Sequence, residues 1–300
     1  MKGVKLNSLA TAKLHSINLQ KPITVPITDR LSVRLYADSR PHCLETASLH
    51  KGLVLMLDNK EVIEEGMGFG VPVAKYRDKT HFSSLAYVSI QGNNSIYLLT
   101  KAYVMDAISR KKFWCSTYIN DDIYTLTRKT FERLYLRHKN VSPVFNSVMA
   151  LRNMAKIKTE FQKVESKGAV TVNYEIQPSI VKVRVDFSDL TLDNCEELLV
   201  LNEQGSDVFD KYSDSSCLKL AGSRIGGWDS VNANEACLSS SKKQISFCLR
   251  KNGKGELFRG RENIKRRFSW AGLNYSLQPN QGVFDYEIRF DCGDSKSGFT

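Results

Sequence analysis

The sequence predicts a mainly β protein: a large antiparallel two-sheet sandwich with a helical insertion at about residues 120–167. Runs of β-branched and aromatic residues separated by short turns recur on both sides of that segment. Strands and helices do not alternate as they would in βαβ units. The 300 residues, 42% apolar and 10% aromatic, can fill a large core. Because no Pro- or Gly-rich linker flanks the helical segment, we expect residues 1–300 to form one domain.

Residues 23–118 are expected to form six or seven sequential strands, as in a meander. The clearest hairpin joins residues 52–57 to residues 61–65 through Asp58 and Asn59, two residue types that tolerate positive φ. Gly92-Asn93-Asn94 marks a second turn.

The hydrophobic period changes after residue 119. Asn120 is a candidate N-cap, and residues 123–135 have an approximate apolar stripe. A second helix is predicted from its N-cap at Ser142 to Gly168, with apolar residues three or four positions apart. Its length of about 35 Å would let it lie across a sheet.

Strands resume after the helical segment. Residues 170–176 and 180–187 are joined by a turn at Gln177-Pro178-Ser179, and Asn252-Gly253 marks a later turn. The other expected strands are 197–201, 207–212, 217–221, 245–250, 256–259, 272–277 and 283–290. Roughly fourteen strands are too many for one twisted sheet, so two packed sheets are predicted.

The net charge of +11 is concentrated in two segments. Lys101–Lys167 holds 14 basic and 6 acidic residues, and Lys242–Arg267 holds 10 basic and 2 acidic residues. This pattern favours an anionic partner, such as nucleic acid, a phosphorylated molecule or an acidic glycan. A solvated helix face and a charged loop would explain the same pattern.

The cysteines and the N-terminus point to a cytoplasmic protein without a membrane segment. Seven cysteines are scattered without CxxC spacing, so we expect buried free thiols. Residues 1–19 lack the apolar stretch of a signal peptide, and no window has the ~18–20 apolar residues that span a bilayer. The five histidines lack ligand spacing, so neither a metal nor a cofactor is predicted.

The segment Glu64–Val73 contains glycines at alternate positions. Because a strand rather than a helix follows, a nucleotide-binding loop is not indicated. One interpretation is a bulged or kinked strand, and the other is a flexible loop that brings Glu64 or Glu65 to a ligand. If Glu65 and His81 face one pocket, they could share general acid and base catalysis. His81 could equally be a structural residue of a strand.

The C-terminal quarter combines tryptophan, arginine and aspartate in nearby segments. Such side chains offer flat apolar faces and forked donors, which suit sugar rings, carboxylates, phosphates or stacked bases. The candidate ligand-binding residues are Arg224, Trp228, Asp229, Arg259, Arg261, Arg267 and Trp270. Alternatively, the tryptophans anchor the core and the arginines pair with Asp229, Glu256 and Glu262.

The leading functional hypothesis is a carbohydrate-associated protein that binds or processes an acidic saccharide. In its many-stranded architecture the chain resembles the galactose-mutarotase-like β-supersandwich proteins, whose members bind or isomerise sugars on a concave β face. The resemblance covers most of the chain and rests on architecture rather than on a shared motif. It implies a sugar ligand and leaves open whether the protein is an enzyme.

Two other functions fit the sequence. The basic run Lys242–Arg267, interleaved with Phe247 and Phe258, fits a nucleic-acid-binding protein that stacks bases on aromatic rings. A structural or partner-docking module would instead use the basic helices as its docking surface. A large apolar patch around those helices would mark that function.

Overall fold

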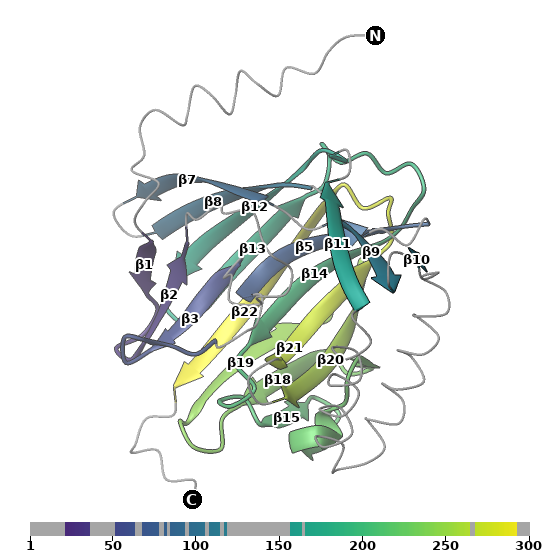
Figure 1. Ribbon diagram of the computed structural model, residues 1–300. Helices are drawn as coiled ribbons and strands as arrows, with labels where there is room; N and C mark the ends of the chain where they lie inside the picture. Colours follow the sequence, from purple (N-terminus) through teal and green to yellow (C-terminus); the bar gives the residue numbers. More distant parts are fainter. Residues whose placement is uncertain are drawn as a thin grey trace, which may run out of the picture.

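The computed structural model describes residues 22–36, 52–63, 68–77, 81–82, 85–93, 96–105, 108–114, 117–118, 157–163, 166–264 and 268–292. Antiparallel strands dominate these ranges, whose one helical element is the 3₁₀ turn η1 (Gly222–Ile225) (Figure 1). The predicted mainly β class is confirmed. None of the described residues belongs to a helix that is long and apolar enough to cross a bilayer.

Ten of the described strands form one antiparallel sheet, in the order β1-β2-β3-β5-β14-β21-β20-β17, with β4 beside β3 and β6 beside β5. Their bounds are β1 (Ile23–Pro26), β2 (Leu31–Leu35), β3 (Leu53–Leu57), β4 (Lys60–Glu61), β5 (Gly68–Tyr76), β6 (His81–Phe82), β14 (Cys195–Gln204), β17 (Asp229–Ser230), β20 (Gly255–Ile264) and β21 (Phe268–Leu277). Strand β14 therefore lies between strands from the two halves of the sequence.

Nine described strands form the second sheet, in the order β16-β15-β18-β19-β22-β13-β12-β8-β7. Their bounds are β7 (Leu85–Asn93), β8 (Ile96–Val104), β12 (Ala169–Gln177), β13 (Ile180–Asp186), β15 (Lys211–Asp214), β16 (Lys219–Ala221), β18 (Glu235–Ser239), β19 (Ile245–Arg250) and β22 (Val283–Cys292). A small third sheet contains β9 (Ile108–Trp114), β10 (Thr117–Tyr118) and β11 (Ile157–Lys163).

The two large sheets pack face to face around one apolar core, which confirms the predicted sandwich. The Phe69 ring of β5 meets the rings of Phe247 and Phe290 edge-on, at centroid distances of 5.0 and 5.7 Å. A hydrogen bond of 2.6 Å also crosses the core, from the Tyr286 hydroxyl to Asn202 Oδ1. Apolar packing and specific polar contacts thus both join the sheets.

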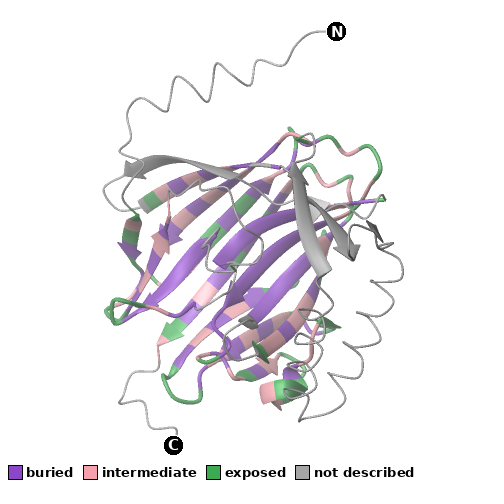
Figure 2. Ribbon diagram, in the orientation of Figure 1, coloured by how far each residue is buried: buried purple, intermediate pink, exposed green. Residues whose placement is uncertain are grey.

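The faces that the two sheets turn away from each other, here called their outer faces, differ in burial (Figure 2). Along β13, buried residues alternate with exposed or half-buried ones, as expected for a strand with one solvated face. Along β5, both faces are buried over most of the strand. A separate apolar cluster of Val71, Val73, Leu199 and Leu201 lies on the outer face of the ten-stranded sheet.

The predicted helical insertion is not supported where it can be checked. Ile157–Lys163 was expected in the second helix, but it forms β11, which pairs antiparallel with β9. Residues four positions apart, such as Ile157 and Phe161, lie on the same side of both a helix and a strand. Their spacing therefore fits a helix as well as a strand. Residues 119–156 of the predicted insertion lie outside the described residues.

The predicted turn chemistry is confirmed at two hairpins. Asp58 and Asn59, with φ of 49° and 64°, connect β3 to β4, and Ser179, with φ of 60°, closes the β12–β13 hairpin. Gly70 has φ of 76° at a register irregularity between β5 and β14. The bulged-strand interpretation of the glycine segment is therefore confirmed at Gly70.

The expectation of free thiols is wrong for one pair of cysteines. Cys237 and Cys248 lie directly opposite each other on β18 and β19 and form a disulfide. The sequence pattern does not predict a strand at β18, so it does not place these residues side by side. Among the described cysteines, the free ones are Cys195 and Cys292, both half-buried, and the exposed Cys217.

Candidate functional site

Two of the predicted ligand-binding residues, Trp228 and Trp270, lie near one edge of the ten-stranded sheet. Strands β20 and β21 pair Glu262 with Trp270 and Gly260 with Gly272. Because alternate strand residues share a face, Phe258, Gly260 and Glu262 lie on the same side as Trp270. The neighbouring residues Leu257, Leu273 and Tyr275 belong to the core, so this side is the outer face.

Trp228, Phe258 and Trp270 form what we call the aromatic platform. The Trp228 ring stacks on Phe258 with a centroid distance of 5.5 Å and an interplanar angle of 20°. Trp228 is 38% exposed, while Phe258 and Trp270 are half-buried. The platform therefore presents an aromatic surface to solvent at Trp228.

Gly260 is the point where the two tryptophan-bearing segments meet. A Cβ at Gly260 would lie 2.5 Å from the Trp270 ring and 2.6 Å from the Gly227 carbonyl oxygen. The ring can lie across β20 only because no side chain projects from Gly260. Glycine at this position thus holds Trp270 against the strand, beside the segment that ends in Trp228.

Carboxylates lie next to the platform. The Trp270 indole Nε1 donates a hydrogen bond of 2.9 Å to Glu262 Oε2. Glu203 lies opposite Gly272 on β14 and is buried, and its Oε1 accepts a bond of 3.4 Å from Asn274 Nδ2. The charged residues that β14, β20 and β21 place beside the described platform are acidic: Glu203, Glu256 and Glu262.

The predicted residues Arg259 and Arg261 point to the opposite side. Arg261 donates to the carbonyl oxygens of Phe209 (3.2 Å) and Ser206 (2.9 Å), and burial lowers the pKa of its guanidinium. Arg259 lies 5.1 Å from the centroid of the Tyr212 ring, and its Nη1 donates to the Ser230 carbonyl at 2.9 Å. Both arginines brace the end of the sandwich rather than the platform.

The other predicted ligand-binding residues flank Trp228 in the sequence or lie outside the described residues. Asp229 Oδ2 lies 3.7 Å from Arg259 Nη2, and Arg224 is an exposed residue of η1. Arg267 and Glu65 lie outside the described residues.

His81 is distant from the tryptophans. It pairs with Lys75, which is the partner of Glu197 on β14. Glu197 is six residues from Glu203, about 20 Å at ~3.3 Å per residue, and two strands separate β5 from β20. The structure therefore does not bring His81 to the platform, and a pocket shared by His81 and Glu65 stays a prediction.

A second polar cluster, which was not predicted from the sequence, lies at the far end of the outer face of the ten-stranded sheet. Lys75 Nζ lies 2.5 Å from Glu197 Oε2, and the Ser276 hydroxyl donates to Glu197 Oε1 at 2.5 Å. Strand alternation was the available signal for this cluster, and for Phe258 and Glu262. Alternation places Phe258 and Glu262 on one face of β20, and it places Arg259 and Arg261, which lie between them in the sequence, on the other face.

The basic residues of Lys242–Arg267 do not form one described patch. Lys242 and Lys243 lie in the turn before β19, whereas Lys251 and Lys254 lie beyond its other end. The six-residue strand between them is about 20 Å long at ~3.3 Å per residue. The described part of this run therefore gives little support to a continuous nucleic-acid surface.

Comparisons with known proteins give only remote structural similarity. No family model matches the chain, and no curated protein matches it. An α-N-acetylgalactosaminidase, NagBb of Bifidobacterium bifidum, aligns over 91% of this chain and 36% of its own, with 8% identity and a TM-score of 0.46. The Slr1438 protein of Synechocystis sp. PCC 6803 covers 93% of this chain and 99% of its own, with 6% identity and a TM-score of 0.38. The HI1317 protein aligns over 90% of this chain and 100% of its own, with 6% identity and a TM-score of 0.36. This chain thus spans about a third of the bifidobacterial enzyme.

Proposed function

We propose that the aromatic platform binds a saccharide. The observation that carries this proposal is the Trp228–Phe258 stack, which exposes an indole ring beside Trp270 and Glu262. Aromatic rings pack against the apolar faces of sugar rings, and carboxylate oxygens accept hydrogen bonds from sugar hydroxyls. The Trp270 indole and the Glu262 carboxylate are already hydrogen-bonded, so the platform is held in place before a ligand arrives.

Among the described residues, the charged side chains that β14, β20 and β21 place beside the platform are acidic, and this favours a neutral saccharide over the acidic one predicted from the sequence. The basic residues 265–267, which connect β20 to β21, lie outside the described residues. Glu262 would repel a uronate or a sulfate, because like charges at short range disfavour binding. Arg259 and Arg261, which could have offset this repulsion, extend from the core side of β20 and donate their hydrogen bonds to the backbone carbonyls of Ser230, Phe209 and Ser206. Binding is the activity we propose, and no catalytic step is assigned.

A glycan array followed by calorimetry on the strongest glycan tests this function. Trp228→Ala is expected to weaken binding at least tenfold, about 1.4 kcal/mol, because it removes the exposed half of the stack. Tyr97→Ala is the matched control, since Tyr97 is 45% exposed on β8 of the other sheet. Binding should be unchanged in this control. No binding to neutral or acidic glycans, or equal binding by Trp228→Ala and the wild type, would contradict the proposal.

The disulfide bears on the cytoplasmic location predicted from the sequence. Disulfides persist in oxidising compartments and are rare in the cytosol. We therefore propose the cytoplasmic location only for a form of the chain in which Cys237 and Cys248 are reduced. Alkylation of thiols in lysed cells, followed by mass spectrometry of the two cysteines, would distinguish the two forms.

A further inference from the structure

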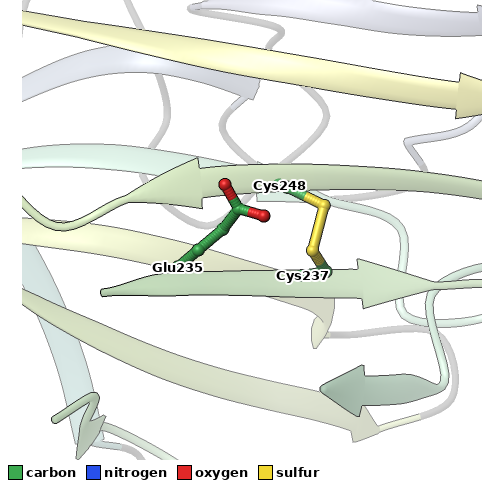
Figure 3. A group of neighbouring side chains, drawn as sticks. All are labelled: Glu235, Cys237 and Cys248. Carbon is green, nitrogen blue, oxygen red and sulfur yellow. A yellow bond between two sulfur atoms is a disulfide. The ribbon is translucent and has the colours of Figure 1, made fainter. Parts of the chain in front are cut away.

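Glu235, Cys237 and Cys248 gather on the outer face of the nine-stranded sheet (Figure 3). The carboxylate oxygen and the two sulfur atoms lie within 4.8 Å of one another, and all three residues are half-buried. Their strand neighbours Ala236 and Leu249 belong to the core, which places the cluster on the opposite, outer side. The cluster is thus held by the paired strands β18 and β19 of the nine-stranded sheet, whereas the aromatic platform lies on the outer face of the ten-stranded sheet.

Two guanidinium groups neutralise the carboxylate while the disulfide is intact. Arg250 Nε lies 2.9 Å and Arg289 Nη1 lies 3.4 Å from the same oxygen, Glu235 Oε2. With uncharged sulfur atoms, the two arginines outweigh the one carboxylate, and the local formal charge is positive. A cation is not attracted to this form.

Reduction opens the disulfide and frees two sulfur atoms as metal ligands. A dithiol reductant cleaves the S–S bond: each sulfur takes one proton, and the dithiol is oxidised to its own disulfide. When a metal ion displaces the protons of both thiols, its ligands Glu235, Cys237 and Cys248 carry three negative charges, which exceed the two positive charges of Arg250 and Arg289.

We propose that reduced Cys237 and Cys248, together with Glu235, form a binding site for a thiophilic divalent cation such as Zn²⁺. Zinc accepts thiolate and carboxylate ligands, and a water molecule would complete the tetrahedron. At Zn–S distances of about 2.3 Å, two sulfur ligands of a tetrahedral ion are about 3.8 Å apart. Cross-strand partners with a Cα–Cα distance of 4.1 Å can supply that spacing. Metal binding displaces the two thiol protons, and the disulfide is the closed form of the site.

Titration with Co²⁺, a spectroscopic substitute for Zn²⁺, tests the site in the full chain. Protein reduced with a dithiol and desalted without oxygen is expected to bind one equivalent of Co²⁺, with thiolate-to-cobalt charge-transfer absorption. The disulfide form should show no such absorption. Cys248→Ser should abolish the signal, whereas Cys217→Ser, which changes an exposed free cysteine, should keep it.

Two further variants separate a built site from adventitious thiol binding. Glu235→Gln should weaken Co²⁺ binding about tenfold while keeping the charge-transfer band, because it removes the oxygen ligand but neither sulfur. Arg289→Gln should tighten binding, because one cation that competes for Glu235 is gone.

Several outcomes would overturn the site. One is reduced wild type that shows free thiols at both positions and binds no Co²⁺, and another is Cys248→Ser that binds Co²⁺ as well as the wild type. Loss of the β-sheet circular dichroism on reduction would also overturn it, because β18 and β19 would no longer hold the ligands together. Glycan binding is measured separately on the other sheet, so the two proposals fail independently.

Discussion

At the residue scale, Asn202 joins three parts of the sandwich through one buried oxygen. Its Oδ1 accepts hydrogen bonds from Gly70 N (3.0 Å) and from the Tyr286 hydroxyl (2.6 Å). Asn202→Ala leaves both donors buried without this acceptor, so we expect a loss of about 3 kcal/mol in the free energy of unfolding. Tyr286→Phe removes one donor and should cost only about 1 kcal/mol. Urea denaturation measures both, and equal losses would show that the amide does not serve both donors.

Asp210 gives a pH-dependent prediction. Burial raises the pKa of this carboxyl, but hydrogen bonds from the Ser241 hydroxyl (2.6 Å) and backbone N–H (2.8 Å) outweigh burial, and the pKa lies below its ordinary value of 3.8. A lowered folded-state pKa stabilises the protein above the unfolded-state pKa, and this stability is lost as the pH falls through the folded value.

Ser241→Ala should therefore destabilise the protein more at pH 7 than at pH 3, below the unfolded-state pKa of about 4. Urea denaturation at the two pH values measures the difference. Ser223→Ala, at an exposed position of η1, is the control and should show no such pH dependence. An equal loss at both pH values for Ser241→Ala would rule out the Asp210 contribution.

The residues of the candidate site were only partly predictable. Trp228 and Trp270 could be grouped because each lies beside glycine and a charged residue, and the structure does bring them to one face. Arg259 and Arg261 were grouped with them by sequence proximity, yet strand alternation turns these arginines inward. The direction of a side chain depends on strand register, which proximity in the sequence does not reveal.

At the scale of elements, the bulge in β5 depends on Gly70. Its φ is 76°, and a Cβ there would lie 2.7 Å from the Tyr174 hydroxyl oxygen. Gly70→Ala should cost about 2–4 kcal/mol of unfolding free energy through backbone strain and this clash. Gly253→Ala, where a Cβ would meet no atom within 4 Å, should be nearly neutral.

A double-mutant cycle identifies the clash. Tyr174→Phe removes the hydroxyl that donates to the Phe69 carbonyl at 2.9 Å, so alone it destabilises the wild type. In the Gly70→Ala background the same change should cost less, because it also relieves the contact. Strictly additive unfolding free energies would show that backbone strain alone explains the effect.

Elements with their own turn chemistry were predictable, and elements made by pairing were not. The β3–β4 hairpin follows from Asp58 and Asn59, which adopt positive φ. Strand β18 reads Glu-Ala-Cys-Leu-Ser, which has few residues of high β propensity, and it is extended because it pairs with β15 and β19. For β11, apolar residues four positions apart fit both periods, so the pairing with β9 decides.

At the scale of the whole molecule, the two outer faces should respond differently to substitution. Leu199 is buried in the apolar cluster on the outer face of the ten-stranded sheet, so Leu199→Asp should cost about 3–5 kcal/mol of unfolding free energy. Arg184→Gln, at an exposed position of the nine-stranded sheet, should change it by less than about 0.5 kcal/mol. If urea denaturation gives a similarly small loss for Leu199→Asp and Arg184→Gln, the outer face around Leu199 is not buried.

The strand order could not be predicted from local patterns. Strand β14 pairs with β5, more than a hundred residues earlier, and with β21, about seventy residues later. Partner choice at such separations depends on which faces and edges meet after collapse, and local propensity does not encode it. Because both large sheets draw strands from distant parts of the sequence, we propose that the chain is one domain.

The position of β22 also affects how the protein can be made. This strand, the last one described, inserts between β13 and β19 in the nine-stranded sheet. While the ribosome is still adding residues 283–292, both neighbours expose unpaired edges that can recruit strands from other nascent chains. Folding of this sheet is therefore expected to finish only after residues 283–292 have left the ribosome, and a brief period of chaperone protection until then should increase the yield.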